Sequence, residues 1–274
     1  MKKINRRSFL AAAGLTAAAL ALTACGGSAS STASSTASSA ASSTSAAAEL
    51  TTVEAGKLTM ATNATFPPYE MTTDSGEIEG IDVDTAKAIA EKLGLELQID
   101  DMDFDAALLS VQQGKADIVM AGVTVTDERK AVMDFSDSYA TGIQSIIVPE
   151  GSDITSPDDL AGKKIGTQRG TTGYIYCSDD FGDDAVVAYD DGLTAVQALK
   201  NGQVDAVVID NAPAKEYVAA NPGLVILDTS YAEEDYAIGM AKGSALEDAV
   251  NAALEELKAD GTLQSIVDKY ITAE

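Results

Sequence analysis

Basic residues are scarce in this chain of 274 residues, which carries 18 Lys and Arg against 43 Asp and Glu and a formal charge of −25. A surface this acidic repels nucleic acid and anionic lipid headgroups, so we expect neither as a partner. Solubility is the simpler consequence of the same charge. The hydrophobic content of 46% is ordinary and predicts one large or two medium folded domains.

Histidine is absent, and cysteine occurs only twice, as Cys25 and Cys177. Because a thiol nucleophile usually needs a histidine base, we interpret Cys177 as a small packing residue. If Cys25 carries lipid, Cys177 has no partner for a disulfide. We expect no catalytic residue, no metal site and no cofactor.

The chain also lacks an apolar run long enough for a confident membrane span, although residues 1–24 have the features of an export signal. A basic start, MKKINRR, precedes the apolar stretch FLAAAGLTAAALAL. The next residues, Leu22-Thr23-Ala24-Cys25, resemble the bacterial lipobox, in which cleavage leaves a cysteine that carries lipid. The alternative is an ordinary signal peptide followed by a chance cysteine. The Arg6-Arg7 pair fits the twin-arginine export route as well as any other basic signal.

Residues 25–54 are predicted to form a disordered tether, because Ser, Thr, Ala and Gly cannot bury enough apolar surface to order themselves. From residue 57 onward, short apolar runs alternate with amphipathic stretches, which predicts an α/β fold with parallel sheets covered on both faces. The expected strands are Leu58–Thr62, Leu95–Asp100, Asp117–Ala121, Ser145–Val148, Lys164–Thr167, Ala185–Tyr189, Ala206–Ile209, Leu224–Leu227 and Tyr236–Met240.

Residues 82–94 have an apolar face, acids in the first turn and a terminal glycine, all typical of a helix. The segments 107–122 and 195–211 both contain an apolar helix end, a glycine, an aspartate and a β-rich run. Two similar lobes would explain this repeat, although helix-glycine-strand units are common in any α/β fold. We predict lobe 1 from residues 55–143 plus 239–274 and lobe 2 from residues 144–238, with two strands as a hinge and the ligand site between the lobes.

The stretch AGVTVTDERK, residues 121–130, places an arginine just after a strand end. Ala121 and Gly122 end the expected strand, and Thr126 is a typical N-cap for the helix that contains Arg129. Loop amides and helix starts gather at such strand ends, so Gly122, the Thr124 hydroxyl and Arg129 could cradle an anion such as a carboxylate. The alternative is a surface ion pair between Arg129 and a nearby aspartate.

Four other features follow expected strands. Aromatic side chains in the loops TNATFPPYE and DMDFDAALL either fill the core or contact a ligand. The loop TQRGTTGY offers amides to a small anion, and the last acid of the run DAVVID could accept bonds from an ammonium group. The candidate residues are Asn63, Phe66, Phe104, Gln168, Thr171, Thr172 and Asp210.

Together these stretches resemble a known family, the amino-acid-binding solute receptors of bacterial ABC importers, which includes the glutamine and the lysine-arginine-ornithine binding proteins. The resemblance covers about residues 57–271. It rests on five motifs in order: TNATFPPYE, GIDVDTAKAIAEKLGL, MDFDAALLSVQQGKADIVMAGVTVTDERKAVMDFSDSY, IGTQRGTTG and VDAVVIDNAP.

The resemblance implies a periplasmic-binding-protein-like fold of type II, with two Rossmann-like lobes that close over one amino acid. It implies a monomeric receptor that delivers an L-amino acid to an ABC importer permease. With lipid on Cys25, the receptor would be anchored at the extracytoplasmic face of the cell membrane and would contact the membrane only through this anchor.

The same resemblance assigns roles to site residues. Arg129 would pair with the ligand α-carboxylate, helped by Thr124 and Thr172. Asp210 and the carbonyl of Gly122 would receive the α-ammonium. Two aromatics that flank the ligand side chain and four further residues complete the implied lining: Phe66, Phe104, Asn63, Ala121, Gln168 and Thr171.

Asn63 stands where several relatives carry an aspartate, which argues against a strongly cationic ligand. A neutral polar side chain such as that of glutamine fits Asn63 and Gln168, and a basic one stays open. The alternative function is an enzyme on the same fold, because cyclohexadienyl dehydratases resemble these receptors. The absence of histidine argues against it, whereas Glu70 beside the first loop keeps it open.

Overall fold

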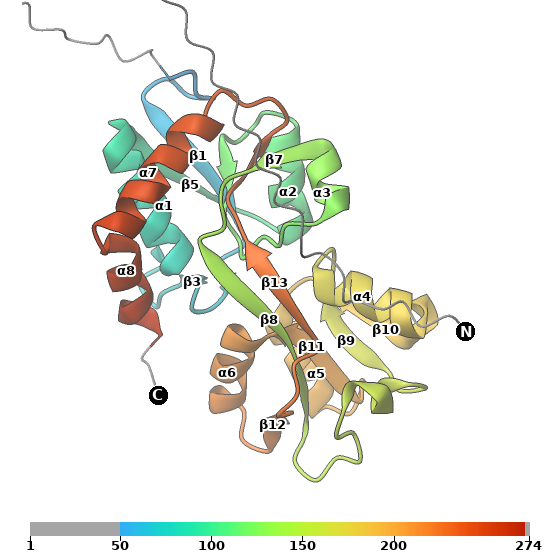
Figure 1. The fold of residues 1–274 in the computed structure, drawn as a ribbon. Coiled ribbons are helices and arrows are strands. Elements are labelled where there is room, and N and C mark those ends of the chain that lie inside the picture. Colours follow the sequence, from blue (N-terminus) through green and yellow to red (C-terminus); the bar gives the residue numbers. More distant parts are fainter. Residues whose placement is uncertain (1–49, 272–274) are drawn as a thin grey trace, which may run out of the picture. The chain divides into compact units, whose positions relative to one another are not determined.

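Two β-sheets organise the computed structural model, which describes residues 50–271 (Figure 1). These residues belong to one structural unit, residues 48–274. The predicted signal peptide, the lipidation site Cys25 and the tether up to residue 49 lie outside the described residues.

The first sheet has the order β5-β1-β6-β14-β7, with β1 parallel to both β5 and β6 and with β14 antiparallel to its two neighbours. Helices α1, α7 and α8 pack together beside it, and α2 packs on β1, β6 and β14. In the order of the sheet, the strands span Glu96–Asp101, Lys57–Thr62, Ile118–Val119, Gly239–Ala241 and Met133–Phe135. The helices α1, α2, α3, α7 and α8 span Ile81–Leu93, Phe104–Gln112, Asp127–Val132, Glu247–Ala259 and Thr262–Tyr270.

The second sheet has the order β10-β9-β11-β8-β12, and β13 pairs with the free part of β8. Its parallel part is β10-β9-β11, onto which α4 and α5 pack, while α6 packs against β8, β11 and β12. The strands β8 to β13 span Ala140–Pro149, Ile165–Gln168, Val186–Tyr189, Ala206–Asp210, Leu224–Ile226 and Ala232–Tyr236. The helices α4, α5 and α6 span Thr172–Phe181, Gly192–Lys200 and Asn211–Ala220. Two short 3-10 helices span Pro157–Leu160 and Asp183–Ala185.

The α/β prediction with two lobes is confirmed, because each sheet with its helices forms one lobe (Figure 1). Strand β8 carries the chain from the first lobe into the second, and β13 carries it back to β14 in the first sheet. These two strands are antiparallel neighbours and form the connecting ribbon between the lobes. The residue boundaries of the lobes stay a prediction.

Helix α1 forms where the sequence predicts it. Asp82 and Asp84 lie in its first turn, where a negative charge is favoured by the helix dipole. Its buried side includes Val83 and Ile89, which belong to the main core cluster. Gly94 ends the helix with a φ of 71°, a left-handed conformation that glycine adopts at little cost.

The sequence repeat has a structural explanation in two aspartates. The carboxylate of Asp117 accepts the amide of Thr59 at 2.8 Å, and the carboxylate of Asp205 accepts the amide of Lys164 at 2.8 Å. Each aspartate follows a helix and a left-handed glycine and fixes the next strand beside a parallel neighbour. The two lobes therefore repeat one helix-turn-strand unit.

Two expected strands form only in part. The expected strand 117–121 shrinks to β6, Ile118–Val119, because Gly122 turns the chain out of the sheet with a φ of 55°. The expected strand 236–240 is split into β13 and β14. Ala237 and Ile238 interrupt it because their amides bond to Val123 and to the Ser136 hydroxyl instead.

A small sheet that was not predicted from the sequence supports the first loop. It has the order β2-β3-β4, formed by Thr65–Phe66, Glu70–Thr72 and Ile78–Glu79. This sheet places Phe66 and Glu70 opposite each other as paired residues on neighbouring strands. Both side chains reach the pocket described below.

Candidate ligand-binding site

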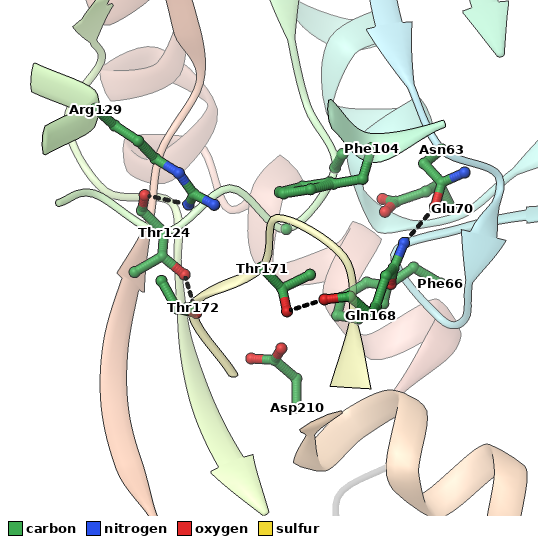
Figure 2. A pocket seen from close by; sticks show the side chains of 12 residues that line it. Asn63, Phe66, Glu70, Phe104, Thr124, Arg129, Gln168, Thr171, Thr172 and Asp210 are labelled. Carbon is green, nitrogen blue, oxygen red and sulfur yellow. Dashed lines mark hydrogen bonds between the residues drawn. The ribbon is translucent and has the colours of Figure 1, made fainter. Parts of the chain in front are cut away.

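One pocket gathers every ligand-binding residue that the sequence predicts (Figure 2). The loops of the first lobe and those of the second face each other around it. The volume of the pocket, including the part that is open to solvent, is about 330 Å³. Its lining consists of Asn63, Phe66, Phe104, Ala121, Gly122, Thr124, Arg129, Gln168, Thr171, Thr172 and Asp210, together with Glu70.

Arg129 is directed into this pocket by the start of α3. Thr126 is the N-cap, as predicted, and its hydroxyl accepts the Arg129 amide. The guanidinium donates to the carbonyl of Thr124 at 2.8 Å and to that of Gly170 at 3.1 Å, so it links the two lobes. The ring of Phe104 lies against it, with the centroid 5.4 Å from the central carbon.

The alternative of a surface ion pair is wrong for Arg129. The side chain is 9% exposed, and within the described residues its guanidinium bonds to carbonyls rather than to a carboxylate. Burial lowers the pKa of Arg129, opposed first by the charge of Glu234. An arginine stays protonated despite such a shift, so the pocket contains a cation with an unused capacity for an anion.

Asp210 provides the opposite charge. It is the last residue of β11, and its carboxylate accepts bonds from the Tyr236 hydroxyl and, at 2.8 Å, from the Gln144 amide. Burial raises the pKa of Asp210 to about 7, although the bonds from Tyr236 and Gln144 act in the other direction. A ligand ammonium would stabilise the ionised form, because an opposite charge favours ionisation.

Three threonines lie between these two charges. Thr171 caps α4 by accepting the Tyr174 amide, and Thr172 is the first residue of that helix. The hydroxyls of Thr172 and Thr124 are 3.5 Å apart, across the pocket between the lobes. The Thr124 hydroxyl also donates to Glu234 at 3.2 Å, so its proton already has an acceptor in the protein.

Asn63 and Gln168 contact each other across the lobes (Figure 2). The Gln168 amide donates to the side-chain oxygen of Asn63 at 2.9 Å, and the Asn63 amide donates to the carbonyl of Met102 at 3.0 Å. Both side chains are buried. This pair forms a neutral polar part of the wall.

Gly122 allows the first loop to approach closely. A Cβ atom at this position would lie 2.8 Å from the ring of Phe66, which is too short for a normal contact. The Gly122 amide donates to the carboxylate of Asp82 at 3.0 Å, which fixes the turn after Ala121. The glycine is therefore required both by its positive φ and by the packing of Phe66.

Glu70 is a pocket residue that was assigned no binding role from the sequence. Its side chain is fully buried, and within the described residues its carboxyl is hydrogen-bonded only to another carboxyl, that of Asp82. Burial, and then the neighbouring charge of Asp82, raises the pKa of Glu70 well above its usual range. Burial also raises the pKa of Asp82 to about 6, although Gly122 and Tyr139 stabilise its charge. The proximity of Glu70 to Phe66 in the same loop is the signal that could have identified it.

Two polar residues of the connecting ribbon were not predicted either. Gln144 lies on β8 and Glu234 on β13, and both side chains are buried behind the pocket lining. The Gln144 amide bonds to both Glu234, at 2.9 Å, and Asp210. No local pattern indicates this contact, because it depends on the pairing of two strands about 90 residues apart.

Residues 50–271 lack both a cluster of metal-ligating side chains and a membrane-spanning helix. No group of three or more histidine, cysteine or acidic side chains in this part of the chain is placed to hold a metal ion. None of its helices is both long enough and apolar enough to cross a bilayer.

The comparison with known proteins decides the family. Residues 58–273 match the profile of the bacterial extracellular solute-binding proteins, family 3. The chain belongs to this family. The predicted resemblance to amino-acid-binding receptors of ABC importers is confirmed, since relatives of the chain are named as binding proteins for histidine, cystine, arginine and glutamine.

Three relatives of this family 3 chain show the extent of the similarity. A probable histidine-binding protein from Neisseria gonorrhoeae is 34% identical, with 99% of this chain and 98% of the relative covered. The structure of the arginine-, lysine-, histidine-binding protein ArtJ from Geobacillus stearothermophilus is 35% identical with a TM-score of 0.76 and coverage of 80% and 96%. An ancestral arginine-binding protein bound to glutamine is 44% identical with a TM-score of 0.76 and coverage of 80% and 99%. All three are named as amino-acid-binding proteins.

Proposed function

We propose that this protein is a lipid-anchored receptor that captures one L-amino acid between its lobes and delivers it to the permease of an ABC importer. The main support is that Arg129 and Asp210, a cation and an anion, both line the same pocket. A zwitterion needs one fixed cation and one fixed anion a short distance apart, and these two residues provide them from opposite lobes.

The ligand backbone would lie between the two charges. Its α-carboxylate would bind the guanidinium of Arg129, with Thr124 and Thr172 beside it, and its α-ammonium would bind Asp210 and the carbonyl of Gly122. Because the Thr124 hydroxyl already donates to Glu234, we assign the donor role at this residue to its amide. Closure of residues 55–143 and 239–274 against residues 144–238 would surround the ligand.

The ligand side chain would lie between Phe66 and Phe104 and end near Glu70. Asn63 and Gln168 bond to each other, whereas the buried carboxyl of Glu70, which lines the pocket, bonds only to the carboxyl of Asp82 among the described residues. A side chain that carries hydrogen-bond donors would satisfy Glu70. We therefore propose a polar ligand, either glutamine-like or basic, and the substrates named for the relatives include both kinds.

A thermal shift assay against the twenty amino acids tests the binding function. A ligand at about 100 times its dissociation constant should stabilise the native state by roughly 2.7 kcal/mol. The receptor proposal requires at least one amino acid to raise the Tm. The lipid anchor has its own test, since a palmitate label should be present on the wild-type protein and absent from Cys25→Ser.

The second candidate, an enzyme similar to cyclohexadienyl dehydratases, has one observation in its favour. Glu70 in the pocket lining and Asp82, which accepts the Gly122 amide behind it, are buried carboxyl groups, and burial raises the pKa of each. Raised carboxyl pKa values are typical of acid and base catalysts but also of structural acids. Consumption of prephenate or arogenate by the purified protein would favour the enzyme and contradict the receptor.

A further inference from the structure

Glu234 is a buried acid that lies behind the pocket rather than in its lining. It is 6% exposed, on the inner face of the ribbon formed by β8 and β13. One of its carboxylate oxygens accepts bonds from the Thr124 hydroxyl at 3.2 Å and from the Gln144 amide at 2.9 Å. The other oxygen is buried and has no partner within the described residues.

These bonds connect Glu234 to both ends of the proposed backbone site. Thr124 accepts from Arg129 through its carbonyl, and the Gln144 amide also donates to Asp210 at 2.8 Å. Glu234 is thus separated from the Arg129 end by one residue and from the Asp210 end by one amide group. Because the Glu234 carboxylate lies near both ends of the backbone site, its electrostatic interaction with a ligand depends mainly on the net charge of that ligand.

The charges around the pocket do not balance. Within residues 50–271, Arg129 is the only basic side chain that is buried, whereas Asp210 in the pocket lining and Glu234 behind it are two buried acids that accept from the same Gln144 amide. The α-carboxylate and α-ammonium of any amino acid cancel each other's charge. A zwitterion therefore leaves the excess of acid unchanged, and only a ligand with an additional positive charge reduces it.

We propose that Glu234 is a specificity-determining residue that makes the pocket prefer amino acids with a net positive charge, without contacting the ligand. The proposal rests on the proposed function and specifies its substrate class. Glu234 attracts the ligand ammonium and repels the carboxylate by similar amounts, so its effect on a neutral amino acid is small. A cationic side chain adds an attraction that nothing cancels.

The test compares L-arginine with L-citrulline, which has nearly the same shape but no charge on its side chain. Isothermal titration calorimetry gives the Kd of each for the wild-type protein and for Glu234→Gln, which keeps the size of the side chain. We expect the ratio of the citrulline Kd to the arginine Kd to fall about tenfold in the variant, since one buried charge is removed from behind the pocket lining. The Kd for citrulline itself should change by less than about threefold.

The strand offers a matched control. Glu233 precedes Glu234 on β13 but is exposed on the opposite face, so Glu233→Gln makes the same change of charge in solvent and should leave the ratio unchanged. Glu234→Asp keeps the charge on a shorter side chain and should retain the preference even if both ligands bind more weakly. Measurement of the Tm of each variant shows whether it is folded.

Three results would overturn the proposal. A Glu234→Gln protein that loses affinity for both ligands by the same factor would show a structural role only. Loss of the preference in Glu234→Asp would show that geometry, not charge, matters. A wild-type protein that binds neutral amino acids but no cationic one would contradict the proposed preference. A wild-type protein that binds no amino acid would instead contradict the proposed function.

Discussion

The hydroxyl of Tyr236 donates a hydrogen bond to the carboxylate of Asp210 and so connects the ribbon between the lobes to the proposed ammonium site. Tyr236 is fully buried, and its ring packs edge-on against Tyr69, with 5.3 Å between the centroids. The ring also crosses Gly142 on the neighbouring strand. The position of Asp210 therefore depends on the geometry of the connecting strands.

The Tyr236→Phe variant should bind the ligand more weakly while it remains folded. Phenylalanine fills the same space, but Asp210 loses one of its two side-chain donors, and its charged form becomes less favourable. We expect a loss of about 1 to 3 kcal/mol of binding free energy, as for other bonds to a charged group. Calorimetry measures it, and Tyr270→Phe on α8, whose hydroxyl bonds to Asp84, is the control. Equal affinities of Tyr236→Phe and wild type would contradict this role.

The Arg129→Ala variant should be the most damaging single change for binding. Removal of the guanidinium leaves the ligand carboxylate buried without a partner, which costs on the order of 2 to 5 kcal/mol. Arg169→Ala is the matched control, because the Arg169 side chain is 56% exposed and does not line the pocket. If Arg129→Ala binds the ligand as tightly as the control does, the carboxylate site lies elsewhere.

Local sequence patterns predicted most of the fold. The alternation of strands and helices, the cap of α1 at Gly94 and the N-cap Thr126 all depend on neighbouring residues, and the structure confirms them. The split between β13 and β14 could not be read in this way. It results from bonds that Ala237 and Ile238 form with residues about 100 positions away.

In the candidate site, too, local sequence patterns predict some residues, and long-range contacts determine the others. The residues at strand ends, such as Arg129 and Asp210, could be predicted because the ends of parallel strands meet in an α/β fold. Their presence in one pocket agrees with that expectation, and their contact with a ligand stays a prediction. Glu234 and Gln144 could not be found, because their importance arises from strand pairing and burial.

The Gly142→Ala variant should weaken both stability and binding. A Cβ atom at this position would lie 2.5 Å from the ring of Tyr236, so the ring must shift and its hydroxyl must leave Asp210. Overpacking of this kind typically costs about 1 to 3 kcal/mol of stability. Chemical denaturation and calorimetry measure the two effects. Thr141→Ala, at the exposed neighbouring position, is the control. Normal binding by Gly142→Ala would show that ligand affinity does not depend on the position of the Tyr236 ring.

The pH dependence of the protein should report the burial of Asp210. Its pKa is about 7 in the folded protein, whereas an unperturbed aspartate has a pKa of 3.8, so between these values the folded state holds a proton that the unfolded state releases. The folded state is therefore stabilised as the pH falls from 7 toward 4, and above pH 7 the buried charge lowers the free energy of unfolding. Asp210→Asn removes this cost.

The ligand-free Asp210→Asn protein should have a higher Tm than wild type at pH 8, and the difference should vanish toward pH 4. Asp82, with a pKa of about 6, titrates in both proteins, so the difference between their pH profiles isolates Asp210. For ligand affinity we expect the opposite ranking, with wild type above Asp210→Asn. The variant should bind poorly at every pH, and the wild-type affinity should fall by up to about tenfold per pH unit below 7, because the ammonium needs an ionised partner. Parallel stability profiles for the two proteins would show that Asp210 keeps an ordinary pKa in the folded state.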